Sequence, residues 1–214
     1  MTILYYLIGG DNMKNDSKIL YKYRSLSNLK RLIEIILDSK LYASRYKDLN
    51  DPMEGYYSYT KEIAQYKKEI NKLKKESLIC SLSKSNNIGM MWIMYADEGK
   101  GCCLEVEVGG NTTWKRIEIE YKEEIPKITD SANINIESIF KYKSSIWNYE
   151  QEVRYIKESP RKYKFPVIIK KIYLGYAYKA SSKEYLFYKA LFKDKLGVDV
   201  ELMSKSDIDF GYMK

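Results

Sequence analysis

The sequence predicts a single α+β domain with a mixed, largely antiparallel sheet and helices inserted between the strands. Short apolar runs, several with period-two alternation, recur along the chain, and segments with helical spacing separate them. We find neither an internal repeat nor a long linker. The 214 residues, 45% of them hydrophobic, suffice for one substantial core.

The first half of the chain predicts alternating strands and helices. Residues 19–24 predict a strand, and Ser27 is the expected cap of a helix whose apolar spacing continues to Leu37. The further elements expected here are a short strand at 41–44, a turn-rich loop at 45–55, a polar helix with one apolar stripe at 56–76, and a strand at 78–82.

The second half predicts more strands. Residues 88–96 are apolar on nearly every side and predict a buried helix. The strand expected at 102–108 has residues 114–121 as its expected hairpin partner. The remaining elements expected are a short helix within 133–143, strands at 149–157 and 167–175, a helix from the capping box at 181–184 to about 195, and a strand at 198–203.

Composition excludes several kinds of chemistry. The chain contains no histidine, which removes Ser-His and Cys-His nucleophile pairs, imidazole-bound zinc and the usual near-neutral general base. Three cysteines with no CxxC pair predict neither a zinc cluster nor a disulfide framework, so we expect three free thiols and a reducing cytoplasm. No apolar run is long enough to span a membrane, and residues 2–10 lack the basic leader and cleavage site of a signal peptide.

The net charge of +8 and the pI near 9.1 raise the question of a nucleic-acid partner. Glutamates accompany the lysines in much of the chain, for example at 67–77, and lysine, isoleucine, tyrosine and asparagine are abundant throughout. We therefore predict that the charge is compositional. A basic face that binds nucleic acid is the alternative.

The most informative segment is WNYEQEVRYI at 147–156. On a regular strand Glu150, Glu152 and Arg154 share one face, because side chains two apart point the same way. Two carboxylates and a guanidinium cannot be left dry without partners. Either the strand is half-exposed and carries cross-strand salt bridges, or this face lines a site that uses the charges.

Three other segments carry polar and aromatic residues in positions that simple packing does not require. They are YKYRSL at 21–26, SRYKDLNDPMEG at 44–55, and the strand–helix–strand block at 80–107. Edge-strand packing, turn formation and core packing are the alternative interpretations. The glycines of the third segment match no phosphate-binding pattern.

Taken in order, these motifs resemble the bacterial domain-of-unknown-function family 2971, to which abortive-infection proteins of the AbiGi type look related. The motifs are YKYRSL, LYASRYKDLNDPMEG, ICSLS, MWIMYADEGKGCCLEVE and WNYEQEVRYI. The resemblance extends from about residue 20 to residue 157 and fades at 56–76, a polar helical insertion, and at 122–143.

The order of motifs also looks like a diverged ADP-ribosyltransferase, as in DarT-like toxins. That resemblance implies a catalytic Glu152 or Glu150 on the late strand. It further implies NAD as substrate, no metal, and the following cofactor-binding residues: Arg24 or Tyr23 on the early strand, Ser44 and Arg45 near the cofactor, and Arg154. The chain departs from the pattern because it has no Ser-Thr-Ser strand. Ser81 and Ser83 are the nearest residues.

The chemistry agrees with this interpretation. Cleavage of the nicotinamide–ribose bond passes through an oxocarbenium-like transition state, which a carboxylate stabilises without histidine, metal or thiolate. An arginine can hold the pyrophosphate, and an aromatic ring can stack on the nicotinamide.

We therefore expect a cytoplasmic bacterial defence or toxin protein that transfers ADP-ribose from NAD to a macromolecule, protein or nucleic acid. The alternatives are a non-catalytic sensor of a nucleotide or phage component, and a metal-independent nuclease.

Overall fold

The structure is a computed structural model, and it describes residues 18–51, 54–55, 58–110, 112–124, 126–159, 161 and 164–211. Three features named above lie outside these ranges: the apolar segment at 2–10, Pro52 of the turn-rich loop, and the first two residues of the helix expected at 56–76.

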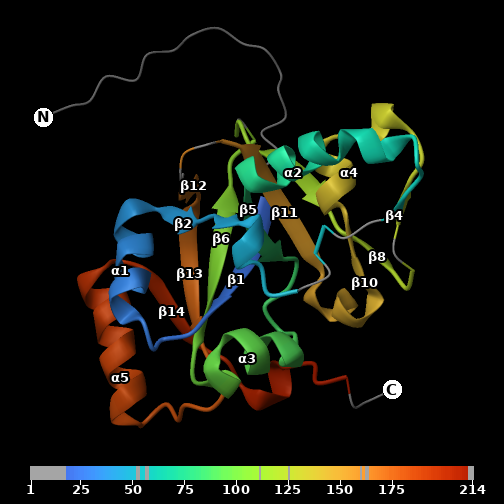
Figure 1. Ribbon diagram of the computed structural model, residues 1–214. Helices are drawn as coiled ribbons and strands as arrows, with labels where there is room; N and C mark the ends of the chain where they lie inside the picture. The colour runs from blue at the N-terminus through green and yellow to red at the C-terminus, as the bar shows by residue number, and fades with distance from the viewer. Residues whose placement is uncertain are drawn as a thin grey trace, which may run out of the picture.

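A curved sheet forms the centre of the molecule (Figure 1). Its neighbouring strands follow the order β14-β13-β6-β1-β5-β11-β7, and β3 pairs with β5 beside this path. The strands are β1 (Lys18–Arg24), β3 (Ser44–Arg45), β5 (Ser77–Ser83), β6 (Cys102–Val108), β7 (Lys115–Glu118), β11 (Glu152–Glu158), β13 (Ile168–Leu174) and β14 (Asp199–Leu202).

All neighbours in this sheet are antiparallel except β13 and β14, which are parallel. Three further pairs of short strands lie outside it: β2 with β12, β4 with β9, and β8 with β10. Their bounds are β2 (Lys40–Tyr42), β4 (Ser58–Tyr59), β8 (Glu120–Lys122), β9 (Lys127–Ile128), β10 (Tyr142–Ser144) and β12 (Lys164–Pro166). The predicted α+β class with a mixed, largely antiparallel sheet is confirmed.

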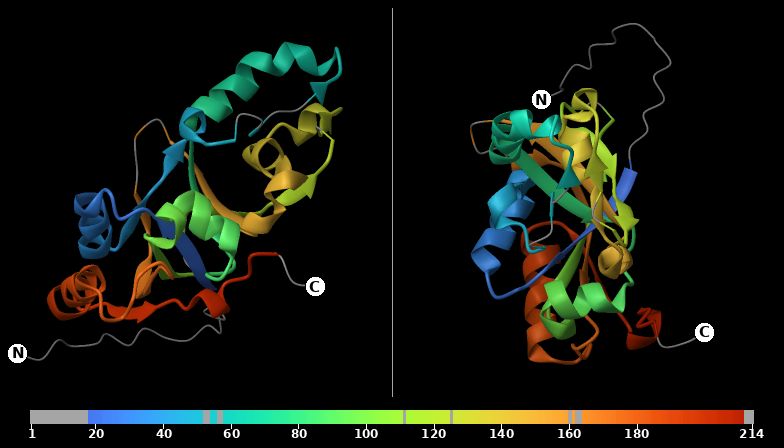
Figure 2. Two further views of the ribbon diagram at one scale, coloured as in Figure 1. Left: turned by 90° about the horizontal axis from the view of Figure 1, so that it is seen from below. Right: turned by 45° about the vertical axis from the view of Figure 1, so that its right-hand side comes forward.

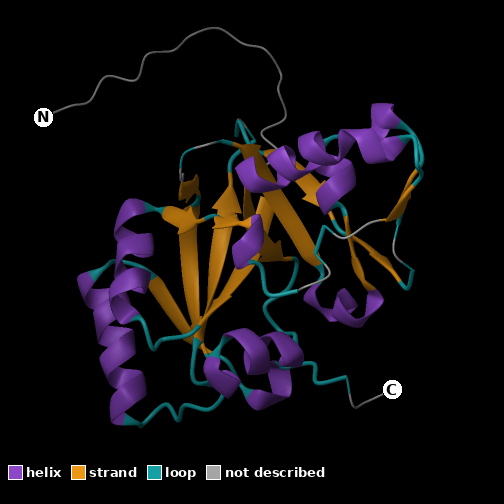
Figure 3. Ribbon diagram, in the orientation of Figure 1, coloured by secondary structure: helices purple, strands orange, loops and turns teal. Residues whose placement is uncertain are grey.

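Helices cover both faces of the sheet (Figures 2 and 3). They are α1 (Leu29–Asp38), α2 (Lys67–Glu76), α3 (Gly89–Tyr95), α4 (Ile136–Phe140) and α5 (Lys183–Lys189), the last continued by a π-helical turn, η6 (Ala190–Lys195). Helices α1 and α5 contribute to the largest hydrophobic cluster, α2 and α4 to a second, and α3 to a third. The 3₁₀ turns are η1 (Tyr46–Asp48), η2 (Ile63–Tyr66), η3 (Asp97–Gly99), η4 (Ser131–Asn133), η5 (Ser145–Glu150) and η7 (Lys205–Asp207).

The feature that positions the site is a fork at one edge of β5. Strand β1 pairs with this edge at a single position, Tyr21 opposite Ser83. Further along the same edge β5 pairs with β3, where Ser44 lies opposite Ile79. Between these two contacts no strand of the described residues pairs with β5 on this side, whereas β11 pairs with the whole of its other edge. A pocket opens at the fork.

Several sequence predictions need correction. The hairpin of 102–108 with 114–121 is wrong, because both edges of β6 are taken by β1 and β13 while β7 pairs with β11. The helix expected at 56–76 is helical only from Ile63, as η2 and α2, and β4 precedes it. The cap of α1 is Asn28, whose side chain accepts a hydrogen bond from the Arg31 amide, and not Ser27.

The composition of α3 had predicted a helix buried on nearly every side. This prediction is wrong. Trp92 is completely buried, but Met90, Ile93 and Met94 are 41%, 37% and 54% exposed. One face of this short helix therefore points to solvent. No helix in the described ranges has the length and apolar character needed to cross a membrane.

Candidate functional site

The pocket at the fork of β5 has a volume of about 200 Å³. Its lining combines carboxylates, two lysines, tyrosines and serine hydroxyls from segments far apart in the sequence. The polar and aromatic lining residues are Tyr21, Lys22, Tyr23, Tyr42, Ser44, Asp48, Asn50, Glu54, Ser81, Ser83, Tyr95, Lys143, Glu150 and Glu152. This pocket gathers carboxylates, amines and hydroxyls from several elements. We treat it as the candidate site.

Glu150 and Glu152 reach the pocket from two different elements. Glu150 ends the 3₁₀ turn η5, and Glu152 starts β11. Gln151 between them has a left-handed backbone, with φ of 47°, so the chain turns sharply here. The regular strand predicted at 149–157 is therefore wrong for residues 149–151. Both carboxylates are nonetheless buried, with Glu150 5% and Glu152 4% exposed. The alternative interpretation, a half-exposed strand with cross-strand salt bridges, is therefore wrong too.

Arg154 anchors Glu152. Its Nε and NH2 donate to the two Glu152 carboxylate oxygens over 2.6 and 2.9 Å, and its NH1 donates to the Phe140 carbonyl over 3.0 Å. The same guanidinium pairs with Glu54, which arrives from the loop after η1. Burial alone opposes ionisation of Glu152, yet Arg154 holds the pKa of this carboxyl well below its usual range. The Glu152 side chain is therefore a fixed anion.

Lys143 joins the two carboxylates. Its Nζ lies 2.5 Å from Glu150 Oε2 and 3.3 Å from Glu152 Oε2, and its side chain is 2% exposed. Burial would lower the pKa of Lys143, but the Glu152 and Glu150 carboxylates outweigh it and hold this pKa above the ordinary value. A charged ammonium therefore lies between two carboxylates at the pocket wall.

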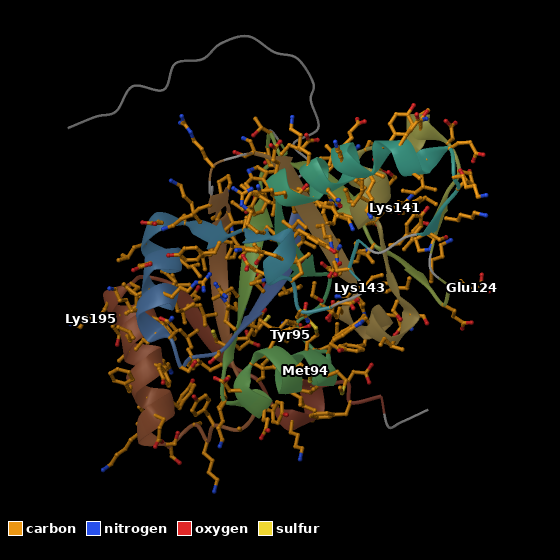
Figure 4. The ribbon with its side chains drawn as sticks, in the orientation of Figure 1. Met94, Tyr95, Glu124, Lys141, Lys143 and Lys195 are labelled. Atoms are coloured by element: carbon orange, nitrogen blue, oxygen red, sulfur yellow. The ribbon has the colours of Figure 1, made fainter. Side chains whose placement is uncertain are left out.

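Tyr95, at the end of α3, contacts Glu150 as well. Its hydroxyl donates to Glu150 Oε1 over 2.7 Å and accepts from the Asn50 side-chain amide. Figure 4 labels Tyr95 on α3 and Lys143 on β10, the two side chains that meet at Glu150. Both Glu150 oxygens thus have donors, one a cation and the other a neutral hydroxyl.

Lys22 occupies the gap in the sheet. Its Nζ donates to the Ser81 carbonyl over 2.7 Å, at the point where β5 lacks a strand neighbour. Burial lowers the pKa of Lys22. A side-chain amine therefore replaces a backbone donor at the fork and forms part of the pocket lining.

The buried cluster has an excess of carboxylates. Glu54, Glu150 and Glu152 face the two cations Lys143 and Arg154. Burial raises the pKa of Glu54, although Arg154 acts against this shift. With all five groups charged, carboxylates outnumber cations by one, and Lys22 is a further amine at the same pocket. The carboxylates beside the pocket suit a cationic ligand or a cationic transition state.

The residues named from the sequence do not all converge. Tyr23, Ser44, Glu150 and Glu152 line the pocket. Arg154 is completely buried in the cluster behind it and is not a lining residue.

The two remaining candidates lie elsewhere. Arg24 shares its face of β1 with Lys22, which does line the pocket, but Arg24 lies at the end of the strand, opposite Cys102 on β6. Arg24 does not line the pocket, and neither does Arg45. NH1 of Arg45 donates to the carbonyls of Glu76 and Ser159 over 3.2 and 2.6 Å, and the side chain lines a different hollow.

Sequence reasoning missed Lys143, Tyr95, Lys22 and Glu54 as site residues. Lys143 fell at the end of an expected helix, and Tyr95 was assigned to core packing. Turn formation and local capping explained Glu54, whereas it contributes to the buried cluster. The segments that carry Lys22, Glu54 and Tyr95 stood out in the sequence, but only long-range contacts show which of their residues meet, and Lys143 carried no local signal.

Comparison with known proteins does not extend this picture, because no protein-family model, no curated protein and no solved structure matches the chain. Within the described residues no group of three or more His, Cys, Asp or Glu side chains is arranged to hold a metal ion.

Proposed function

We propose that the pocket binds the nicotinamide riboside end of NAD and that the protein transfers ADP-ribose to a macromolecule, acting in bacterial defence or as a toxin. One observation carries the proposal. Two buried carboxylates, Glu150 and Glu152, flank the ammonium of Lys143 at a pocket that tyrosines also line. The resemblance to family 2971 and to DarT-like toxins points the same way, and three free thiols suit a reducing cytoplasm.

Size and charge both fit one end of the dinucleotide. Ligand pockets typically measure about 300–1,000 Å³, so a pocket of about 200 Å³ suits part of NAD better than the whole molecule. The nicotinamide ring of NAD is a cation, and Glu150 and Glu152 place two buried carboxylates at the pocket. Tyrosine rings provide surfaces against which a planar ring can pack.

The proposed reaction uses the carboxylates in different roles. The C1′–N bond of the nicotinamide riboside breaks, its electron pair goes to the ring nitrogen, and neutral nicotinamide leaves. A hydroxyl or amine of the acceptor attacks C1′ and gives its proton to Glu150. Glu152, fixed by Arg154 and Lys143, stabilises the positive charge that develops on the ribose.

This assignment revises the roles expected from the sequence. Arg154 holds Glu152 and does not contact the dinucleotide. Arg24 has no part at the nicotinamide end, since it does not line the pocket. Ser44 and Tyr23 remain lining residues that the ligand meets.

The test uses NAD labelled in its adenylate half. Purified full-length protein is incubated with this NAD and a bacterial extract, and nicotinamide release and transferred label are measured. Glu150→Gln keeps the size of the side chain and removes its charge. We expect activity to fall by about 10²–10⁴-fold, the usual contribution of a general base.

The matched control is Glu201→Gln, an exposed carboxylate on β14 that pairs with Lys171 and does not line the pocket. It should leave activity unchanged. If the folded protein arrests growth when expressed but releases no nicotinamide, the transferase proposal fails. Binding of NAD without cleavage would instead identify a nucleotide sensor, and cleavage of nucleic acid would identify a nuclease.

A further inference from the structure

A second hollow, of about 910 Å³, lies between η1 and the C-terminal half of α2. It is distinct from the carboxylate pocket. Four of its lining residues are cationic and two are carboxylates: Arg45, Lys47, Lys74, Lys75, Asp48 and Glu76. Asn71 and Tyr46 complete it. Because its charge is opposite to that of the carboxylate cluster, this hollow suits an anion.

The hollow has a defined wall. Lys74 lies with its Nζ 4.8 Å from the centroid of the Tyr46 ring, and that ring packs against Phe140 at 5.9 Å. Behind them Gly55, with φ of 61°, comes so close that an added Cβ would lie 3.2 Å from the Tyr46 ring and 3.4 Å from Lys74. Burial lowers the pKa of Lys74, so an anion placed beside it would favour its charged form.

The two cavities adjoin each other across η1. Asp48 lines both of them, and the consecutive residues Ser44 and Arg45 line one each. A ligand that passes over Asp48 would therefore have one end among carboxylates and the other among lysines. NAD has this polarity, with a cationic ring at one end and a pyrophosphate in the middle.

We propose that the basic hollow binds the adenosine diphosphate half of the dinucleotide whose nicotinamide riboside half occupies the carboxylate pocket. This inference rests on the proposed function for the identity of the ligand. Lys47, Lys74 and Lys75 contact the phosphate oxygens. Asp48, at the junction, accepts hydrogen bonds from ribose hydroxyls.

ADP tests the hollow independently of any reaction. Binding of ADP to the full-length protein is measured by calorimetry at physiological salt, for the wild type and for Lys47→Ala and Lys75→Ala. Each substitution should weaken binding about tenfold, the usual effect of losing one charge-assisted contact to phosphate. Both lysines are exposed, so the fold should survive.

The matched control is Lys67→Ala, an exposed lysine on the same helix that does not line the hollow. It should bind ADP as the wild type does. If Lys67→Ala weakens binding as much as Lys75→Ala, or if none of the substitutions matters, the assigned site is wrong. A single-stranded oligonucleotide that binds more tightly than ADP, with equal dependence on all three lysines, would show an extended nucleic-acid surface and overturn the assignment.

Competition separates this inference from the proposed function. ADP should displace NAD from the Glu150→Gln variant, because that substitution leaves the basic hollow intact. If ADP binds through Lys47 and Lys75 but the wild type never releases nicotinamide, the assignment of the basic hollow as an ADP-binding site is upheld and the transferase proposal fails. If ADP and NAD bind without competing, the hollow does not hold the same dinucleotide.

Discussion

Arg154 holds both carboxylate oxygens of Glu152, its neighbour two positions earlier on β11, with Nε and NH2 at 2.6 and 2.9 Å. Both side chains are almost completely buried. This fork-to-fork contact fixes the orientation of Glu152 at the pocket.

Glu152→Gln should destabilise the fold. A glutamine cannot match both donors of the guanidinium, and breaking a buried ion pair on one side costs about 3–5 kcal/mol. Urea unfolding should show that the free energy of unfolding falls by this amount in Glu152→Gln. The control Glu118→Gln, which changes an exposed carboxylate on β7, should lower it by less than about 1 kcal/mol. Equal midpoints for the two variants would contradict a structural role for the Glu152–Arg154 pair.

Acid should weaken the wild type through the same carboxylate. The folded pKa of Glu152 is depressed, so its contribution is present above its unfolded pKa of about 4.3 and is lost as pH falls toward the folded pKa. The raised pKa of Glu54 acts in the opposite sense, because acid relieves the cost of its burial. The free energy of unfolding between about pH 5 and pH 2 should therefore fall more steeply in the wild type than in Glu152→Gln. Parallel curves would contradict this.

Tyr95→Phe should reduce activity with little effect on stability. The substitution removes the hydroxyl that donates to Glu150 and accepts from Asn50, while the ring keeps its packing. We expect nicotinamide release to fall about tenfold, since one hydrogen bond to a charged group contributes about 1.5–3 kcal/mol. Tyr178→Phe is the control, because its hydroxyl donates to the Lys100 carbonyl away from the pocket. Equal activity of the two variants would remove Tyr95 from the mechanism.

All three thiols should be free but unreactive in the native protein. Cys80, Cys102 and Cys103 are buried, and burial raises the pKa of Cys80 to about 11 and that of Cys102 to about 12. A thiol reagent should titrate three groups in denaturant without reductant, and react much more slowly with the folded chain at neutral pH. A count of one would reveal a disulfide.

The sequence predicted most strands of the main sheet because their apolar runs are local signals. β1, β5, β6 and β13 begin and end within a residue or two of the expected bounds. The partners of these strands depend on non-local pairing. The predicted hairpin of β6 with β7 is therefore wrong. The residues between these two strands carry no information about β11, which is the strand that pairs with β7.

The site shows the same division. Charges within an apolar segment singled out Glu150, Glu152 and Arg154, and the structure places all three in one buried ion-pair cluster. From strand periodicity we expected Glu150 and Glu152 on one face of a regular strand. In the structure they meet because the chain turns at Gln151, whose backbone is left-handed. Lys143 and Glu54 reach the cluster only through folding of distant segments, and only the structure shows that Lys22, and not Arg24 on the same face of β1, lines the pocket.

The fork of β5 has a consequence for how such a site can diversify. One wall of the pocket is the edge of a β-strand, whose Ser81 carbonyl accepts from the Lys22 side chain in place of a neighbouring strand. Side-chain substitutions cannot remove that carbonyl, because the path of the backbone sets it. A surrounding loop supplies Asn50 and Glu54, and helix α3 supplies Tyr95; these can be exchanged without re-pairing any strand of the main sheet. New ligand preferences would therefore arise at the rim, while the strand edge stays the same.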